Sequence, residues 1–242
     1  TQNISSLDDF KVGAVWAGDY DSSKDAADAK DKFNDKNEIC RYLNDGENFV
    51  DLDGNPINAD MEAAAKLVGL QFIVNVIIDE HKKTVAAFAG DCIKAHRRGC
   101  EYLRAFCEVA ASPADIVLTS NGGYPLDQNF YQCVKGMTAA EACLNENGVI
   151  IMCAECSSGH GGYGFYSSLR NCTSPAELYA RQLATPWDRT EPDQWESQIL
   201  CRILSKYRTI FVTQPGLRSM VEDMKMTYAA DIPSALALAR SW

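Results

Sequence analysis

Tyr131, Gln132 and Lys135 are the residues of this sequence whose types and spacing could do chemistry. Residues three and four apart are neighbours on a helix surface, so a helix through this segment would present a phenol, an amide and an ammonium together. A lysine ammonium can pair with a carboxylate, and a glutamine side chain can donate to or accept from its oxygens. We therefore expect one wall of a ligand-binding site at this point.

The residues before this group predict how it is positioned. The run Ile116 to Leu118 is short, apolar and β-branched, as is typical of a buried strand in a parallel sheet. Gly122 and Gly123 supply a turn, and the residue before Pro125 is restricted to extended backbone, so a helix begins only after the proline, with Asp127 as its expected cap. Open α/β sheets bind ligands in the loops at the carboxyl ends of their strands. The alternative is a simple turn followed by a solvated helix face.

Several ordered motifs at consistent spacing extend the pattern beyond this wall. The run from Gly122 to Asn129, followed by Tyr131, Gln132 and Lys135, is the most specific of them. The others are Gly54-Asn55-Pro56, Asp60-Met61, Phe72 to Ile77, Ala86 to Asp91, His96 to Cys100, Ala154-Glu155-Cys156 and Pro192 to Trp195. In this order, over roughly residues 54–242, the chain resembles the nickel-pincer lactate racemase family.

This resemblance implies a 2-hydroxy-acid racemase or epimerase, with lactate as the default substrate. Members of the family are understood to move the hydride of the α-carbon onto a nickel-pincer nucleotide, a pyridinium thioamide/thiocarboxylate mononucleotide, and to return it to either face of pyruvate. The resemblance implies two catalytic residues, Gln132 and Lys135. It implies as substrate-binding residues Tyr131, Trp195, Gly122 and Gly123.

The resemblance also implies paired histidine bases, a cofactor-bearing lysine and a nickel-ligating histidine, all in an N-terminal part of the protein. The stretch before Gly54, which begins Asp35-Lys36-Asn37-Glu38, contains no histidine. We therefore expect a C-terminal portion of a racemase-like protein, or a divergent relative, that binds no cofactor or metal alone and is inactive alone. Its expected partners are a small 2-hydroxy acid and the N-terminal part of the same protein.

Trp195 and Lys135 each have a plainer interpretation. A tryptophan at the start of a helix can close a pocket and exclude water from a hydride transfer, but it can also be a core aromatic against Ile199 and Ile203. Lys135 can be an ordinary solvated lysine. In the functional interpretation these two side chains act together with Tyr131 and Gln132, and only when the domain closes against the N-terminal part of the protein. This predicts hinge motion between domains.

The alternation of strands and helices predicts an α/β fold. We expect a poorly matched acidic N-terminal segment over residues 1–53, a smaller α+β unit over residues 54–111 and a substrate-facing C-terminal domain over residues 112–242. Strands separated by helical crossovers in the last part imply a parallel sheet in a three-layer arrangement. A boundary near Ser112-Pro113 divides the two folded parts.

Composition restricts the possible partners. Hydrophobic residues make up 46% of the 242-residue chain, and the net charge of -10 argues against nucleic acid or anionic membrane as a main partner. No apolar stretch approaches the length of a membrane span and no signal peptide is evident, so we expect a cytoplasmic protein. We interpret the ten cysteines as mostly free thiols in apolar runs.

Two motifs leave other functions open. Gly159 to Gly164 satisfies G-x-G-x-x-G after a strand, which would suit a nucleotide-dependent oxidoreductase, although a loop at the edge of the active site is the simpler interpretation. Cys153 and Cys156 form an isolated C-x-x-C, with His160 as a third ligand at best, and packing is the alternative to metal or redox work. A non-catalytic module that binds a small carboxylate or a protein is the remaining alternative. Nickel content and pyridine-nucleotide binding distinguish among them.

Overall fold

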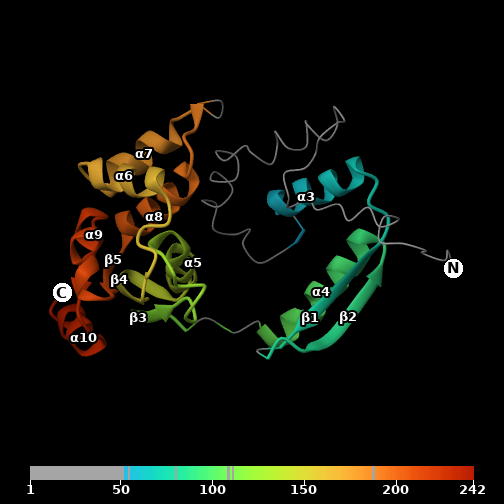
Figure 1. The fold of residues 1–242 in the computed structure, drawn as a ribbon, viewed down its shortest axis with the longest axis horizontal. Helices are drawn as coiled ribbons and strands as arrows, with labels where there is room; N and C mark the ends of the chain where they lie inside the picture. The colour runs from blue at the N-terminus through green and yellow to red at the C-terminus, as the bar shows by residue number, and fades with distance from the viewer. Residues whose placement is uncertain (1–51, 54, 80, 108–109, 111, 187–188) are drawn as a thin grey trace. The chain divides into compact units, whose positions relative to one another are not determined.

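The structure is a computed structural model that describes residues 52–242, except residues 54, 80, 108–109, 111 and 187–188. Contacts divide the described residues into two compact units, residues 52–107 and residues 110–242 (Figure 1). The predicted acidic segment over residues 1–53 lies, apart from its last two residues, outside the described residues.

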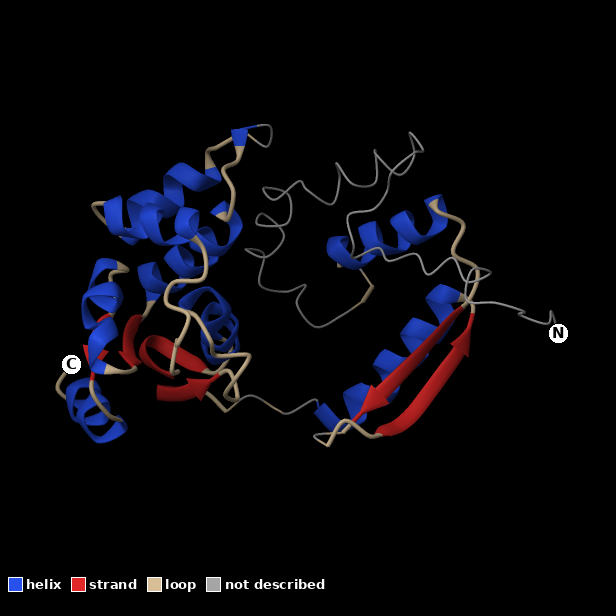
Figure 2. Ribbon diagram, viewed as in Figure 1, coloured by secondary structure: helices blue, strands red, loops and turns tan. Residues whose placement is uncertain are grey.

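The first unit is a β-hairpin with two helices. Its elements are α3 (Pro56–Leu67), β1 (Ile73–Ile78), β2 (Thr84–Gly90) and α4 (Cys92–Cys107). The strands pair antiparallel, and α4 packs along the hairpin (Figure 2). A methyl group on Gly99 of α4 would lie 3.5 Å from the Phe88 ring, so helix and hairpin are in ordinary van der Waals contact.

The second unit contains a four-stranded parallel sheet in the order β3-β4-β5-β6. The strands are β3 (Ala114–Ser120), β4 (Leu144–Cys153), β5 (Arg208–Val212) and β6 (Thr227–Ala229). The helices are α5 (Phe130–Glu141), α6 (Tyr163–Asn171), α7 (Pro175–Leu183), α8 (Gln194–Lys206), α9 (Arg218–Asp223) and α10 (Ile232–Arg240), with a 3-10 turn at Pro215–Leu217. This confirms the predicted α/β fold with a smaller unit before it.

The side chains of the central strands alternate between two helical layers. Val149 and Ile151 of β4 pack with Ala235 and Ala239 of α10 on one face. On the other face Phe130 of α5 lies 4.6 Å from Phe211 of β5, centroid to centroid. Figure 1 shows α5 and α10 on opposite sides of the sheet, so the three-layer prediction is confirmed. Each fully buried aliphatic or aromatic side chain contributes about 1.5–3 kcal/mol.

The predicted start of α5 was wrong by two residues. Asn129, not Asp127, is the cap, because the Asn129 Oδ1 accepts from the Gln132 N–H at 2.9 Å. The Asp127 carboxylate is turned instead toward the loop after β4, where Oδ2 accepts from the Glu155 N–H at 3.2 Å.

Among the described residues, none of the helices is long and apolar enough to cross a membrane.

Candidate functional site

The first turn of α5 is held by backbone groups of the loop after β4. The N–H of Phe130 donates to Gly159 C=O at 3.1 Å, and the N–H of Tyr131 donates to His160 C=O at 3.2 Å. The next N–H is satisfied by the Asn129 cap. Since a helix leaves its first N–H groups unpaired unless something caps them, these bonds fix the position of Tyr131 and Gln132.

Gln132 and Lys135 come together on this helix, as their spacing predicts. The Lys135 Nζ donates to the Gln132 Oε1 at 2.7 Å, and the Lys135 side chain is exposed. No carboxylate of the described residues forms an ion pair with Lys135. The ammonium thus has a neutral neighbour that orients it, and it can still accept an anionic partner from solvent.

The glycine turn is tied to the same part of α5. Gly122 and Gly123 have φ of 80° and 89°, left-handed values that only glycine adopts without strain. Just before them, the Asn121 Nδ2 donates to Leu126 C=O at 2.8 Å and to Gln132 C=O at 2.6 Å. The Asn121 side chain therefore closes the glycine turn and joins it to Gln132, the residue that orients Lys135.

Trp195 lies beside Tyr131, so α8 contributes to the same wall. The two rings meet edge to face with centroids 5.8 Å apart, and Phe165 of α6 meets Tyr131 at 5.4 Å. Burial raises the pKa of the Tyr131 phenol above its ordinary value, and the nearby Glu196 and Asp193 carboxylates add to this. Tyr131 therefore stays neutral at physiological pH.

Glu196 is a residue of this site that the sequence interpretation missed. Its side chain is 1% exposed, and its Oε1 has no hydrogen-bond partner among the described residues. Burial raises the pKa of this carboxyl to about 8, while the Lys135 ammonium opposes the shift. The missed signal was periodicity, since Glu196 precedes Ile199, Leu200 and Ile203 by three, four and seven residues on the buried face of α8.

Comparisons with known proteins give this arrangement its context. Residues 109–242 match the family of lactate racemase C-terminal domains. The chain belongs to the lactate racemase family. It is 52% identical over 190 residues to the lactate racemase of Thermoanaerobacterium thermosaccharolyticum, covering 78% of this chain and 45% of that protein. It is 45% identical over 182 residues to the lactate racemase of Lactiplantibacillus plantarum, covering 75% and 43%.

A solved structure agrees with these relatives. The structure of the lactate racemase apoprotein from Thermoanaerobacterium thermosaccharolyticum superposes with a TM-score of 0.80 at 48% sequence identity, covering 86% of this chain and 50% of that one. The chain therefore spans about half the length of the lactate racemases it matches. It has the fold of that part of the lactate racemase apoprotein.

The glycine-rich loop from Gly159 to Gly164 does not present a free phosphate site. Gly162 caps α6, but a methyl group there would lie 2.9 Å from the Asp193 Oδ2, so a carboxylate already lies at the start of the helix. The His160 Nδ1 accepts from the Gly162 N–H at 3.1 Å, and the ring stacks on Tyr166 with centroids 5.1 Å apart. These contacts favour a structural loop over the dinucleotide alternative.

Cys153 and Cys156 of the C-x-x-C motif have different neighbours. The Cys156 Sγ lies 3.8 Å from the Cys133 Sγ of α5, and both residues are fully buried, whereas Cys153 belongs to the core against α10. Cysteines among the described residues are free thiols. Packing between α5 and the loop after β4 is thus the role that the contacts support.

The described residues do not fit a nickel-binding role. Within the described ranges, no three His, Cys, Asp or Glu side chains are grouped so that they could hold a metal ion. A metal site built wholly from three or more such side chains is therefore not formed by the described residues. The proposed wall contains a phenol, an amide, an ammonium and an indole, which suit an organic substrate rather than a metal.

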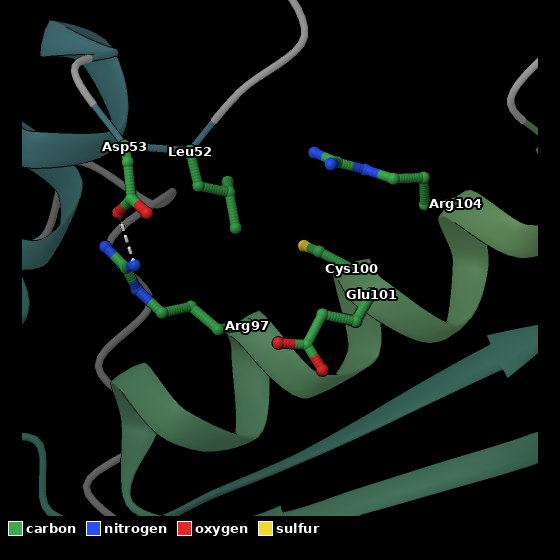
Figure 3. Close-up of a pocket in the computed structure, with 6 residues that line it drawn as sticks. All are labelled: Leu52, Asp53, Arg97, Cys100, Glu101 and Arg104. Carbon is green, nitrogen blue, oxygen red and sulfur yellow. Dashed lines mark hydrogen bonds and ion pairs between the residues drawn. The ribbon is translucent and has the colours of Figure 1, made fainter.

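The first unit has a cavity of its own, which none of the wall residues lines. It measures about 350 Å³ and is lined by Leu52, Asp53, Arg97, Cys100, Glu101 and Arg104 (Figure 3). The Arg97 guanidinium is already paired, at 2.6 Å from the Asp53 Oδ1 and 3.0 Å from the Glu62 Oε1. Because its acidic partners neutralise it, Arg97 stabilises the first unit rather than offering a vacant anion site.

Proposed function

We propose that this chain supplies the substrate-facing wall of a 2-hydroxy-acid racemase, with lactate as the default substrate. The observation that carries the proposal is the exposed Lys135 ammonium, oriented by Gln132 and unpaired with any carboxylate of the described residues, in a chain of the lactate racemase family. An ammonium of this kind pairs with a substrate carboxylate through a charge-assisted hydrogen bond.

Each wall residue then has a role that suits its chemistry. Lys135 binds the carboxylate, and Gln132, which can both donate and accept, orients the ammonium and the hydroxyl end of the substrate. Tyr131 and Trp195 form an aromatic edge that excludes water from the reacting carbon. The turn at Gly122 and Gly123 brings backbone close to the ligand, because neither residue has a side chain in the way.

The cofactor belongs, in this proposal, to the part of the longer protein that the chain does not span. We assign the nickel-pincer nucleotide and its lysine and histidine partners to that part, because no three His, Cys, Asp or Glu side chains of the described residues are grouped as a metal site. This chain alone is then inactive, and the wall acts when the longer protein closes over its substrate.

The test measures lactate racemisation, with nickel quantified in parallel, for this chain and for the longest product of its native gene after supply of the pincer cofactor. We expect activity and retained nickel only in the longer product. Activity in neither, with no nickel retained, would contradict the proposal and favour a module that binds a carboxylate without chemistry. Activity in this chain alone would show that the cofactor residues lie within it.

A further inference from the structure

The glycine-rich loop from Gly159 to Gly164 is a motif that the proposed function leaves without a role. Its C=O groups at Gly159 and His160 accept from the first N–H groups of α5. Its last residues begin α6, and both α6 and α5 pack on α8 (Figure 1). The loop therefore contacts both helices that carry the aromatic edge of the wall, α5 with Tyr131 and α8 with Trp195.

Gly162 is the residue of this loop that lies between the two sides of the aromatic edge. A methyl group there would lie 3.4 Å from the Tyr131 Cδ2 and 2.9 Å from the Asp193 Oδ2. Tyr131 belongs to α5, whereas Asp193 is the residue just before α8, two positions ahead of Trp195. A single backbone position thus separates the Tyr131 ring from the segment that holds Trp195.

Close packing, and not backbone conformation, explains the glycine at this position. The φ of Gly162 is -158°, which is extended backbone that any residue adopts. Gly164 lies in the first turn of α6, where alanine would be the better helix former, yet a methyl group there would lie 2.7 Å from the Pro192 C=O oxygen. Both positions exclude a side chain because the start of α6 lies directly against the residues before α8.

Asp193 provides the other half of this contact. Its φ of 63° and ψ of 8° are left-handed values, which are uncommon for a residue with a side chain and persist where the surroundings hold them. Its carboxylate makes no capping bond to α8. The Oδ2 lies instead at the start of α6, where the helix dipole favours a negative charge. Asp193 therefore links the start of α6 to the start of α8.

We propose that Gly162 is a positioning residue that, together with Asp193, sets the distance between the Tyr131 and Trp195 rings. The two rings meet edge to face with centroids 5.8 Å apart. A side chain at position 162 would displace the Tyr131 ring or Asp193, and either displacement separates Trp195 from Tyr131. Only the catalytic consequence rests on the proposed function, because the ring contact can be measured without a ligand.

The first experiment measures nuclear Overhauser cross-peaks between the Tyr131 and Trp195 rings of this chain, with labelled aromatic side chains. The Trp195 resonances are identified as those missing from Trp195→Phe, and the Tyr131 resonances as those missing from Tyr131→Phe. We expect Gly162→Ala to lose the cross-peaks. The matched control is Gly216→Ala, which should keep them, because a methyl group there meets nothing within 4 Å.

A second variant protects the test against misfolding of Gly162→Ala. Asp193→Gly should fold, because glycine suits the left-handed backbone, and it should weaken the cross-peaks by leaving a gap where Gly162→Ala overfills the space. In the double variant the methyl group takes the place of the carboxylate, so the cross-peaks should return. Cross-peaks of full intensity in either single variant, or their absence from a folded double variant, would overturn the proposal.

The catalytic consequence is measured in the longer protein, with kcat expressed per retained nickel so that a loss of folded enzyme does not count. In Gly162→Ala we expect kcat for lactate to fall at least about tenfold and KM to stay within about twofold, because the contact between Lys135 and Gln132 does not involve the loop. The double variant should regain most of kcat, and Gly216→Ala should match wild type.

The two experiments separate this proposal from the proposed function. If the longer wild-type protein does not racemise lactate, the proposed function fails, while the ring cross-peaks still decide whether Gly162 and Asp193 set the ring distance. Lost cross-peaks with an unchanged kcat would overturn the role of Gly162 as a positioning residue of the reaction.

Discussion

Gly136 is where α5 comes closest to the glycine turn, which makes Gly136→Ala a direct test of how that turn is fastened. A methyl group there would lie 2.5 Å from the Asn121 Oδ1, 3.2 Å from Ser120 C=O and 3.3 Å from the Met152 Cε. The first distance is far inside van der Waals contact. Asn121 would have to move, although its amide bonds Leu126 C=O and Gln132 C=O.

Two opposing effects set the magnitude. Alanine is favoured over glycine inside a helix by about 1 kcal/mol. Displacing Asn121 forfeits two hydrogen bonds, each with a net contribution of about 0.5–1.5 kcal/mol, and crowding against Met152 adds about 1–3 kcal/mol. We therefore expect Gly136→Ala to lower the free energy of unfolding of the second unit by about 1–5 kcal/mol, the opposite sign to helix propensity.

The assay is native-state amide hydrogen exchange of α5, read by mass spectrometry, in a double-mutant cycle with Asn121→Ala. Once Asn121 is removed, its clash disappears, so Gly136→Ala should be at least 1 kcal/mol less damaging in that background. Gly99→Ala is the matched control, because its methyl group meets Phe88 at an ordinary 3.5 Å and should leave α4 unchanged or more stable. Stabilisation by Gly136→Ala in the wild-type background would refute this reasoning.

Three further predictions concern the buried groups. Ser197→Ala should cost about 1–3 kcal/mol in urea unfolding, because the buried Gln182 Nε2 donates to the Ser197 Oγ at 2.6 Å and would lose its acceptor; an unchanged midpoint would contradict this. Because the pKa of Glu196 is raised to about 8, its protonated form favours the folded state below about pH 4.5, and this contribution falls as pH rises toward 8. Wild type should therefore lose free energy of unfolding between pH 5 and pH 8, and Glu196→Gln should lose less, by up to roughly 4 kcal/mol. Urea unfolding of both proteins at the two pH values measures this difference. Cys133 should resist thiol reagents until the chain is unfolded, whereas the exposed Cys107 should react at once.

Much of the fold could be predicted from periodicity. The alternation of apolar strands and amphipathic helices from Ala114 onward indicated a parallel sheet, and Ser174 followed by proline is a local start signal for the helix Pro175–Leu183. The end of α5 carries no such local signal. The helix ends at Glu141, since Cys143 C=O accepts from the Ala114 N–H and begins the pairing of β4 with β3. That bond is a tertiary contact that local sequence does not encode.

The candidate site, like the fold, could be predicted from the sequence only in part. Helical spacing was enough to place Gln132 beside Lys135, and resemblance placed Trp195 in the same group, where it meets Tyr131. The backbone capping of α5 by Gly159 and His160 could not be predicted, because it joins segments about thirty residues apart through C=O groups that every residue has. Glu196 lies on the buried face of α8 with Ile199 and Ile203, but the sequence alone does not show which side chains surround an acid at that position.

The most direct test of the central claim is the steady-state kinetics of lactate racemisation by the longer protein with Lys135→Ala, beside Lys94→Ala as an exposed helix-lysine control. If Lys135 binds the substrate carboxylate, its loss removes a charge-assisted hydrogen bond of about 1.5–3 kcal/mol, so kcat/KM should fall at least tenfold with nickel content and fold intact. The control should match wild type. Unaltered kinetics in Lys135→Ala would remove Lys135 from the site and contradict the assignment of this wall to the substrate.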